Sequence, residues 1–332
     1  MKARFHVGLA MAAVAGSALG FMPIASAQYD PAPRVNIYAE QASDRAAEAV
    51  TLPRGVVEAA SAYETYLRGA AAIRAGFRDE ASVERAMLVG EAYQPEQLEK
   101  GLIAYAALIA LEDEGFVRGV RDQVRGPGDA ERAAYALQSD PNNLAMIPGS
   151  GDAAAMVRAV LRKEGGQLFE TGRAVKQSAY DVQHQAWSKQ DVPDPARRLA
   201  KAKSLATSAF VPAPEDVSRL LRSAAGFRGR RAGMQDGPPV LSPVIQRGLT
   251  LAALAVLGQA TDERRLTQLF SEPRGADCMK MAKLNLYQCL AVAGPHYEDI
   301  FCLGQHALMD TGQCLASGGG SPLRIETSLP RN

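Results

Sequence analysis

Four cysteines near one end constrain the fold of this chain more than any other feature: Cys278, Cys289, Cys302 and Cys314. An even number of cysteines favours disulfides if the chain is exported, which the N-terminal residues considered below lead us to expect. The first two lie in a segment with helical character, residues 277–293, and the others lie mostly in a second such segment, from residue 295 to about 309. Gly294-Pro295 between them is typical of a helix end followed by a helix start. The pattern therefore predicts a helical hairpin.

Helix geometry selects the pairing of these cysteines. In an antiparallel hairpin, residues face one another about a common midpoint, and the pairs 289/302 and 278/314 both centre on the Gly294-Pro295 corner. Cys278 and Cys289 are 11 residues apart, about three turns, and Cys302 and Cys314 are 12 apart, which we interpret as close to one face. We therefore predict the nested bridges Cys289–Cys302 and Cys278–Cys314. A Cys278–Cys289 bridge is excluded because a helix of that length rises about 16 Å, whereas bridged Cα atoms lie within about 7 Å.

This arrangement resembles the twin-cysteine helical hairpins of the coiled-coil-helix-coiled-coil-helix type. Those motifs have nine residues between the cysteines of each helix and this chain has ten and eleven, so the resemblance extends to the geometry alone. The alternative is a metal site, because four possible zinc ligands recur at every fourth position: Glu298, Cys302, His306 and Asp310. No pair of cysteines separated by two residues exists, and such a site would take Cys302 from its bridge. We therefore predict no metal and no other cofactor.

The N-terminus has the three parts of a secretory signal peptide. Lys2 and Arg4 precede an apolar run over residues 7–19, and Ala25-Ser26-Ala27 supplies the small residues of a cleavage site. The alternative, a membrane anchor, would need about 20 apolar residues, and glycine, serine and proline interrupt this run. We expect cleavage after Ala27 and a periplasmic or secreted protein. No later segment is long and apolar enough to be an integral membrane helix.

Apolar residues recur at intervals of three and four along most of the chain, and no clear strand pattern is present. The fold class we predict is all-α, an irregular multi-helix bundle or array with the disulfide-stapled hairpin at its C-terminal end. Two apolar stretches, 102–111 and 249–257, are interpreted as buried core helices, and Gly165-Gly166 as the break between helices over 153–163 and 167–189. The predicted organisation is a signal peptide (1–27), a helical domain (28–225), a Gly/Pro/Arg-rich loop or linker (226–241), a C-terminal helical segment with four cysteines (242–316) and a flexible tail (317–332).

Charge is balanced overall but uneven locally. Without Lys2 and Arg4 the chain keeps 35 basic and 36 acidic residues, which gives no reason to expect nucleic acid as a partner. Residues 195–231 carry an excess of arginine and lysine that would suit an anionic component of the cell envelope. The binding candidates there are Arg228, Arg230 and Arg231. The alternative is a solvated helix face and loop, since no aromatic residues alternate with the arginines.

One helix face carries residues suited to chemistry. In the helix expected over 167–189, Lys176, Tyr180, His184 and Trp187 share a face and Asp181 lies beside it. Tyr180, Asp181 and His184 are the catalytic candidates, and Lys176 and Trp187 the binding candidates. The alternative is that the aromatic residues belong to the core or to an interface, as tyrosine and tryptophan often do.

No nucleophile motif, phosphate loop, dinucleotide fingerprint or zinc-protease motif is present in the sequence. The leading hypothesis is therefore a non-enzymatic periplasmic interaction or scaffold module with protein partners in the cell envelope. The alternatives are an enzyme or small-ligand binder that uses the Tyr180 face, and a binder of an anionic envelope component through residues 195–231.

Overall fold

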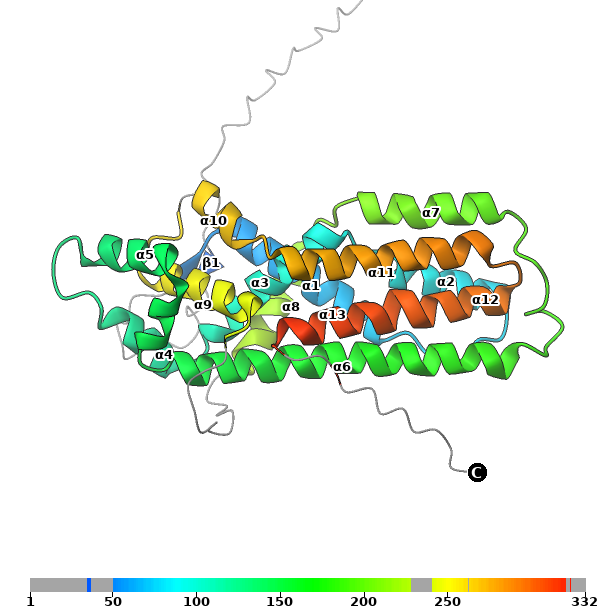
Figure 1. The fold of residues 1–332 in the computed structure, drawn as a ribbon, viewed down its shortest axis with the longest axis horizontal. Coiled ribbons are helices and arrows are strands. Elements are labelled where there is room, and N and C mark those ends of the chain that lie inside the picture. The colour runs from blue at the N-terminus through cyan, green and yellow to red at the C-terminus, as the bar shows by residue number, and fades with distance from the viewer. Residues whose placement is uncertain (1–34, 37–49, 228–240, 262, 321–322, 324–332) are drawn as a thin grey trace, which may run out of the picture. The chain divides into compact units, whose positions relative to one another are not determined.

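The structure is a computed structural model that describes residues 35–36, 50–227, 241–261, 263–320 and 323. The elements in order are β1 (Val35–Asn36), β2 (Thr51–Leu52), α1 (Arg54–Ala71), α2 (Glu80–Gly90), α3 (Pro95–Ala110), α4 (Glu114–Arg121), α5 (Asp129–Ser139), η1 (Pro141–Met146), α6 (Ser150–Val182), α7 (Pro195–Thr207), α8 (Pro214–Ala225), α9 (Pro243–Val256), α10 (Glu263–Leu269), α11 (Pro273–Val292), α12 (His296–Cys302), η2 (Leu303–Asp310) and α13 (Thr311–Gly318). The two strands form a two-residue antiparallel pair. The predicted all-α class is confirmed (Figure 1).

Local sequence signals set most helix starts. Proline occupies the first turn of α3, α7, α8, α9 and α11, where its missing N–H costs nothing. Asp79 caps α2 by accepting a hydrogen bond from the Ser82 amide at 2.7 Å. The Ser242 hydroxyl likewise accepts from the Ile245 amide at 3.3 Å, so α9 begins where the Ser242-Pro243 pair predicts.

The core centres on α3 and α9, which confirms the interpretation of their apolar stretches as buried helices. Every residue from Leu102 to Ala110 is buried. The two helices approach closely, because a methyl group at Gly248 would lie 2.6 Å from the Ala106 Cβ. A single hydrophobic core takes in buried residues from both sides of the 228–240 gap, for example Tyr63 and Leu286. The two helical segments expected from the sequence therefore share one core.

The stapled hairpin is confirmed. Cys278 is bonded to Cys314 and Cys289 to Cys302, and both bridges have Cα–Cα distances of 5.7 Å. The described residues contain no free cysteine. The corner between the two arms lies at residues 293–295, where the sequence placed it. The bridges thus tie α11 to a second arm made of α12, η2 and α13.

The second arm differs from the sequence expectation, because it continues beyond residue 309 to Gly318 and contains a π-helical segment, η2. Twelve residues of α-helix turn through about 1,200°, which would leave Cys302 and Cys314 roughly 120° apart around the axis. In a π-helix each N–H bonds five residues back, so each residue turns through a smaller angle. The eight π-helical residues therefore bring Cys314 back towards the side of Cys302.

Helix α6 is continuous through Gly165-Gly166, so the break expected there is wrong. The second arm of the hairpin runs alongside α6 (Figure 1), and glycines line the contact. A methyl group at Gly165 would lie 2.5 Å from the Ala316 nitrogen, and one at Gly172 would lie 2.6 Å from the Met309 nitrogen. These glycines allow two backbones to touch, and this packing outweighs their low helix propensity.

Helix α6 ends at Val182, seven residues before the expected end. The buried Ser188 hydroxyl bonds the Val182 carbonyl and closes the turn that follows. The chain then pairs with the hairpin corner, where the Val192 amide donates to the Gly294 carbonyl at 2.9 Å. Tertiary hydrogen bonds thus replace the continued helix.

Several expectations fall on residues that the structure does not describe. The signal peptide over 1–27, residues 228–240 of the loop or linker, and most of the tail over 317–332 lie outside the described residues. Gly318, placed in that tail, ends α13 instead. Among the described helices, none combines the length and apolar character needed to cross a membrane.

Candidate functional site

The predicted catalytic residues do not converge. Tyr180 lies on α6 and lines a hollow of about 400 Å³ beside the Cys289–Cys302 bridge. Asp181 is exposed and accepts a hydrogen bond from Gln177 at 3.1 Å. His184 is exposed and lies beyond the end of α6, so it does not continue the face that carries Tyr180.

The two binding candidates of that face have partners within the protein. The Lys176 ammonium donates to Gln305 at 2.7 Å and lies 5.0 Å from the centre of the Phe301 ring. Trp187 follows α6, packs partly buried against the core and donates to Gln185 at 2.6 Å. The structure therefore brings together Lys176 and Tyr180, which both contact Phe301, and leaves the other three residues of the set apart.

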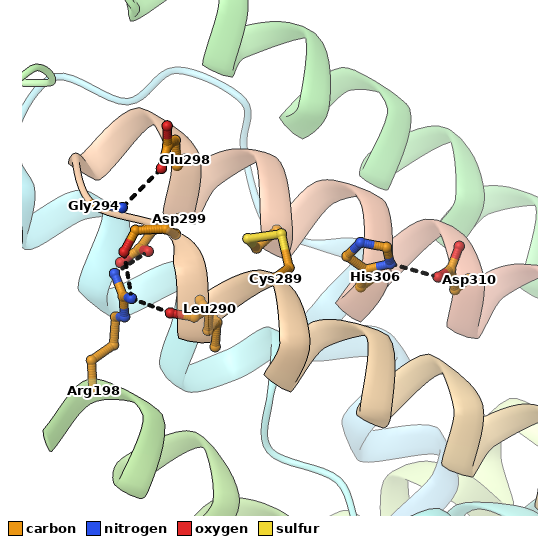
Figure 2. Close-up of a disulfide and its surroundings, with 10 residues drawn as sticks. Arg198, Cys289, Leu290, Gly294, Glu298, Asp299, His306 and Asp310 are labelled. Carbon is orange, nitrogen blue, oxygen red and sulfur yellow. Dashed lines mark hydrogen bonds and ion pairs between the residues drawn. A yellow bond between two sulfur atoms is a disulfide. The ribbon is translucent and has the colours of Figure 1, made fainter. Parts of the chain in front are cut away.

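The remaining candidates are the three arginines after α8 and the possible zinc ligands of the hairpin. Arg228, Arg230 and Arg231 lie outside the described residues. In the possible zinc stripe, Cys302 is part of a disulfide and the His306 Nδ1 atom lies 2.8 Å from an Asp310 carboxylate oxygen (Figure 2). The described part of the chain contains no group of three or more histidine, cysteine or acidic side chains arranged to hold a metal ion.

A cleft that the sequence analysis missed lies between α2, the corner at 192–194, α7 and α12. Its volume is about 700 Å³, within the range of small-molecule sites. We call it the Glu91 cleft; its lining residues are Glu80, Val83, Glu84, Met87, Leu88, Glu91, Val192, Pro193, Asp194, Arg197, Arg198, Ala200, Lys201, Ser204, His296 and Asp299. Apolar side chains thus share the cleft with a dense group of ionisable ones.

Glu91 is the unusual residue of this cleft. It directly follows the last residue of α2, and only 4% of its surface is exposed. Its Oε1 atom is buried and has no hydrogen-bond partner among the described residues. Burial raises the pKa of this carboxyl group well above its usual range, with the charge of Lys283 opposing the shift.

Lys283 approaches Glu91 from α11 but does not satisfy its carboxyl group. The buried ammonium donates to the main-chain carbonyl of Glu91 at 2.5 Å and lies 3.9 Å from the centre of the Tyr93 ring. Burial lowers the pKa of this lysine, and the nearby Glu91 opposes that shift. The lysine thus holds the backbone at Glu91 and leaves the Oε1 atom of that residue without a hydrogen-bond partner among the described residues.

Arg198 fixes the opposite wall of the cleft. Its guanidinium donates to Asp299 at 2.5 Å and to the carbonyls of Leu290 and Ala293, the latter at 3.0 Å (Figure 2). The pKa of Asp299 is raised to about 6 because the group is buried, and Arg198 acts against that shift. This ion pair joins α7 to the hairpin corner through the two terminal nitrogens of Arg198, while its buried Nε atom has no hydrogen-bond partner among the described residues.

Pairs also form at the mouth of the cleft. Lys201 on α7 lies 2.8 Å from Glu84 on α2, and the pKa of Glu84 is lowered mainly by that lysine. The buried imidazole of His296 lies 3.7 Å from the exposed carboxylate of Glu80. These contacts hold α7 and α12 against α2 and define the opening.

The arrangement is suited to holding a small ligand. A buried carboxyl group without a partner has lost its hydration, and a ligand that donates a hydrogen bond to it recovers part of that free energy. Perturbed pKa values in a cleft are also typical of functional sites. Glu91 is therefore the candidate ligand-binding residue of this cleft.

The sequence contained one signal that points to this region. Met279, Lys283, Leu286 and Leu290 recur on one face of α11, and all four are buried. A lysine inside an apolar stripe indicates a buried cation that needs a polar partner. No sequence pattern identifies that partner, because Glu91 lies 192 residues earlier in the chain.

A second buried polar cluster is structural. The hydroxyls of Tyr63 and Tyr105 donate to Glu164 at 3.4 and 2.8 Å, and tie α1 and α3 to α6. Burial raises the pKa of Glu164 to about 7, against the effect of these two hydrogen bonds. Its carboxyl group therefore has the partners that Glu91 lacks.

Comparison with known proteins gives no family for this chain: no protein-family model matches it, and no curated protein or solved structure is significantly similar to it.

Proposed function

We propose that this is an exported helical protein that binds a small organic ligand in the Glu91 cleft. The observation that carries the proposal is Glu91, which lines a cavity of about 700 Å³ and whose buried Oε1 atom has no partner among the described residues. Apolar walls and one well-placed polar group are the usual composition of such sites. Export to the periplasm is supported by the N-terminal sequence signals and by two disulfides, which persist in oxidising compartments.

The ligand proposal is tested by filling the cleft. Ala200 lines the cleft from α7 and is exposed, so Ala200→Trp should occupy the space without disturbing the core. Ala196 lies on the same helix, is also exposed and does not line the cleft, which makes Ala196→Trp the matched control. We expect a thermal-shift screen of small organic molecules to give ligands that stabilise wild type and the control but not Ala200→Trp. Ligands that stabilise all three proteins equally, or a screen without any ligand, would refute the proposal.

Export is tested on protein from its native host. A non-reducing peptide mass map should begin at Gln28 and contain both bridges. An intact Met1 would contradict export.

A second candidate is the interaction module favoured by the sequence. On α11, Met281, Leu284 and Val292 are 52, 45 and 84% exposed and recur within one side of the helix. Exposed apolar side chains that cluster are typical of protein contacts, and an envelope protein is the proposed partner. A photo-crosslinker at position 284 should capture one such protein, while a crosslinker at the exposed Arg173 of α6 should not. Equal capture from both positions, or capture from neither, would count against this candidate.

A further inference from the structure

The charges that line the Glu91 cleft show which ligand it suits. Two basic side chains already have acidic partners, Arg198 with Asp299 at 2.5 Å and Lys201 with Glu84 at 2.8 Å. A cation held by a carboxylate at this distance attracts a ligand anion weakly, because the two charges largely cancel. The pairs therefore contribute shape to the cleft and little net charge.

Among the lining side chains outside these pairs, Glu91 is the buried acid. Glu91 is buried and its Oε1 atom has no partner. Asp194 accepts a hydrogen bond from the Arg197 amide at 2.9 Å and caps α7, and the Arg197 side chain is exposed to water. The nearest buried cation, Lys283, donates to the main-chain carbonyl of Glu91 and not to its Oε1 atom, which has no partner among the described residues, and solvent screens the basic Arg197 at the mouth.

Three ligand classes can be compared against this interior. A ligand carboxylate would have to lie beside Glu91, and two carboxyl groups in one site repel when both ionise. A polyhydroxylated ligand needs many polar partners, but Val83, Met87 and Leu88 make much of the wall apolar. A protonated amine on an apolar body satisfies Glu91 with a charge-assisted hydrogen bond and places its hydrocarbon against these side chains.

We propose that the ligand of the Glu91 cleft is a small organic ammonium ion, whose N–H groups donate to the Glu91 carboxylate while its apolar body packs against Val83, Met87 and Leu88. This inference rests on the proposed function. The ammonium ion supplies the hydrogen-bond donor that the Glu91 carboxyl group lacks, so the bound state holds a hydrogen-bonded pair in place of an unpartnered acid.

The test uses three probes of similar shape in calorimetric titrations at neutral pH: phenethylamine, phenethyl alcohol and hydrocinnamate. We expect wild-type protein to bind the amine at least about tenfold more tightly than the alcohol, and the carboxylate most weakly. Glu91→Gln removes the charge and keeps the shape, so it should weaken amine binding at least about tenfold and leave the alcohol nearly unchanged. Glu96→Gln is the matched control, because Glu96 lies outside the cleft and is paired with Lys280 at 3.3 Å, and it should change amine affinity by less than about threefold.

The outcomes separate the two proposals. If the alcohol or the carboxylate binds as tightly as the amine, and Ala200→Trp abolishes that binding, the cleft is a ligand site and the ammonium assignment is wrong. If none of the probes binds, or if Ala200→Trp leaves amine binding intact, both proposals fail. The comparison of probes is made on wild-type protein, so the assignment can be refuted even if Glu91→Gln does not fold.

Discussion

The contact between α6 and the second arm of the hairpin gives a prediction in which neighbouring positions behave oppositely. Gly165 and Gly166 are adjacent inside α6. Replacing a glycine with alanine in a helix interior gains about 1 kcal/mol of stability when space is available. At Gly166 the nearest atom to the added methyl group is a Leu323 side-chain carbon 3.8 Å away, so this gain should be realised.

At Gly165 the same methyl group would lie 2.5 Å from the Ala316 nitrogen and 2.7 Å from the Gly312 oxygen. These are backbone atoms, which cannot rotate away, so the two helices must separate. Overpacking of this kind costs about 1–3 kcal/mol, and we expect the upper end here. A cost of about 3 kcal/mol less the helix-propensity gain of about 1 kcal/mol leaves Gly165→Ala destabilised by about 2 kcal/mol. Gly166→Ala keeps the gain of about 1 kcal/mol, so the two variants should differ in stability by roughly 3 kcal/mol.

The assay is thermal unfolding under oxidising conditions, with both bridges intact. An unfolding entropy of about 2.1 cal/mol/K per residue gives roughly 0.6 kcal/mol/K for a chain of about 300 residues. The expected difference in Tm between the two variants is thus about 5 °C. Equal Tm values, or a higher Tm for Gly165→Ala, would refute the close contact between these helices.

Three further predictions concern buried interactions. Arg198→Ala leaves the Asp299 carboxylate buried without its cation and should lower the free energy of unfolding by about 3–5 kcal/mol in urea titrations; a loss below about 1 kcal/mol would contradict the buried pair. Removing the Cys278–Cys314 bridge with paired serines should cost about 4 kcal/mol and removing the shorter bridge about 3, because their sequence separations are 36 and 13; the reverse order in chemical denaturation would contradict this. Burial raises the pKa of Glu164 from 4.5 to about 7. Between these two pH values the folded protein keeps a proton that the unfolded chain has released. The contribution of this group to stability is therefore fully present below pH 4.5 and is lost as the pH rises to about 7. Glu164→Gln should remove that part of the pH dependence, and an unchanged pH profile of unfolding would refute the assignment.

The sequence identified features that depend on near neighbours along the chain. Ser242-Pro243 set the start of α9 because a cap and a proline act within one helical turn. The nested bridges followed because the Gly294-Pro295 corner brings residues equally distant from it together. The apolar period of α3 and α9 placed them in the core, since burial of apolar surface drives their packing.

Features that depend on contacts between distant segments could not be predicted from the sequence. Gly165-Gly166 has the composition of a break, and only contact with Gly312 and Ala316 makes a continuous helix favourable there. The predicted helix face around His184 assumed that the helix continues to residue 189. The helix ends at Val182 instead, and the chain after it forms hydrogen bonds with the hairpin corner.

The Glu91 cleft is the clearest case of a feature that depends on distant segments. In the sequence Glu91 is an acidic residue at a helix end, a type of position that is usually solvated. Its burial and its unpartnered oxygen arise when α7 and α12, more than 100 residues later, close over α2. The sequence by itself determined several helix starts, the two buried core helices and the pairing of the cysteines, because those interactions act over a few turns of chain. The tertiary structure alone decided which carboxyl group lost its water, because desolvation depends on every segment packed around it.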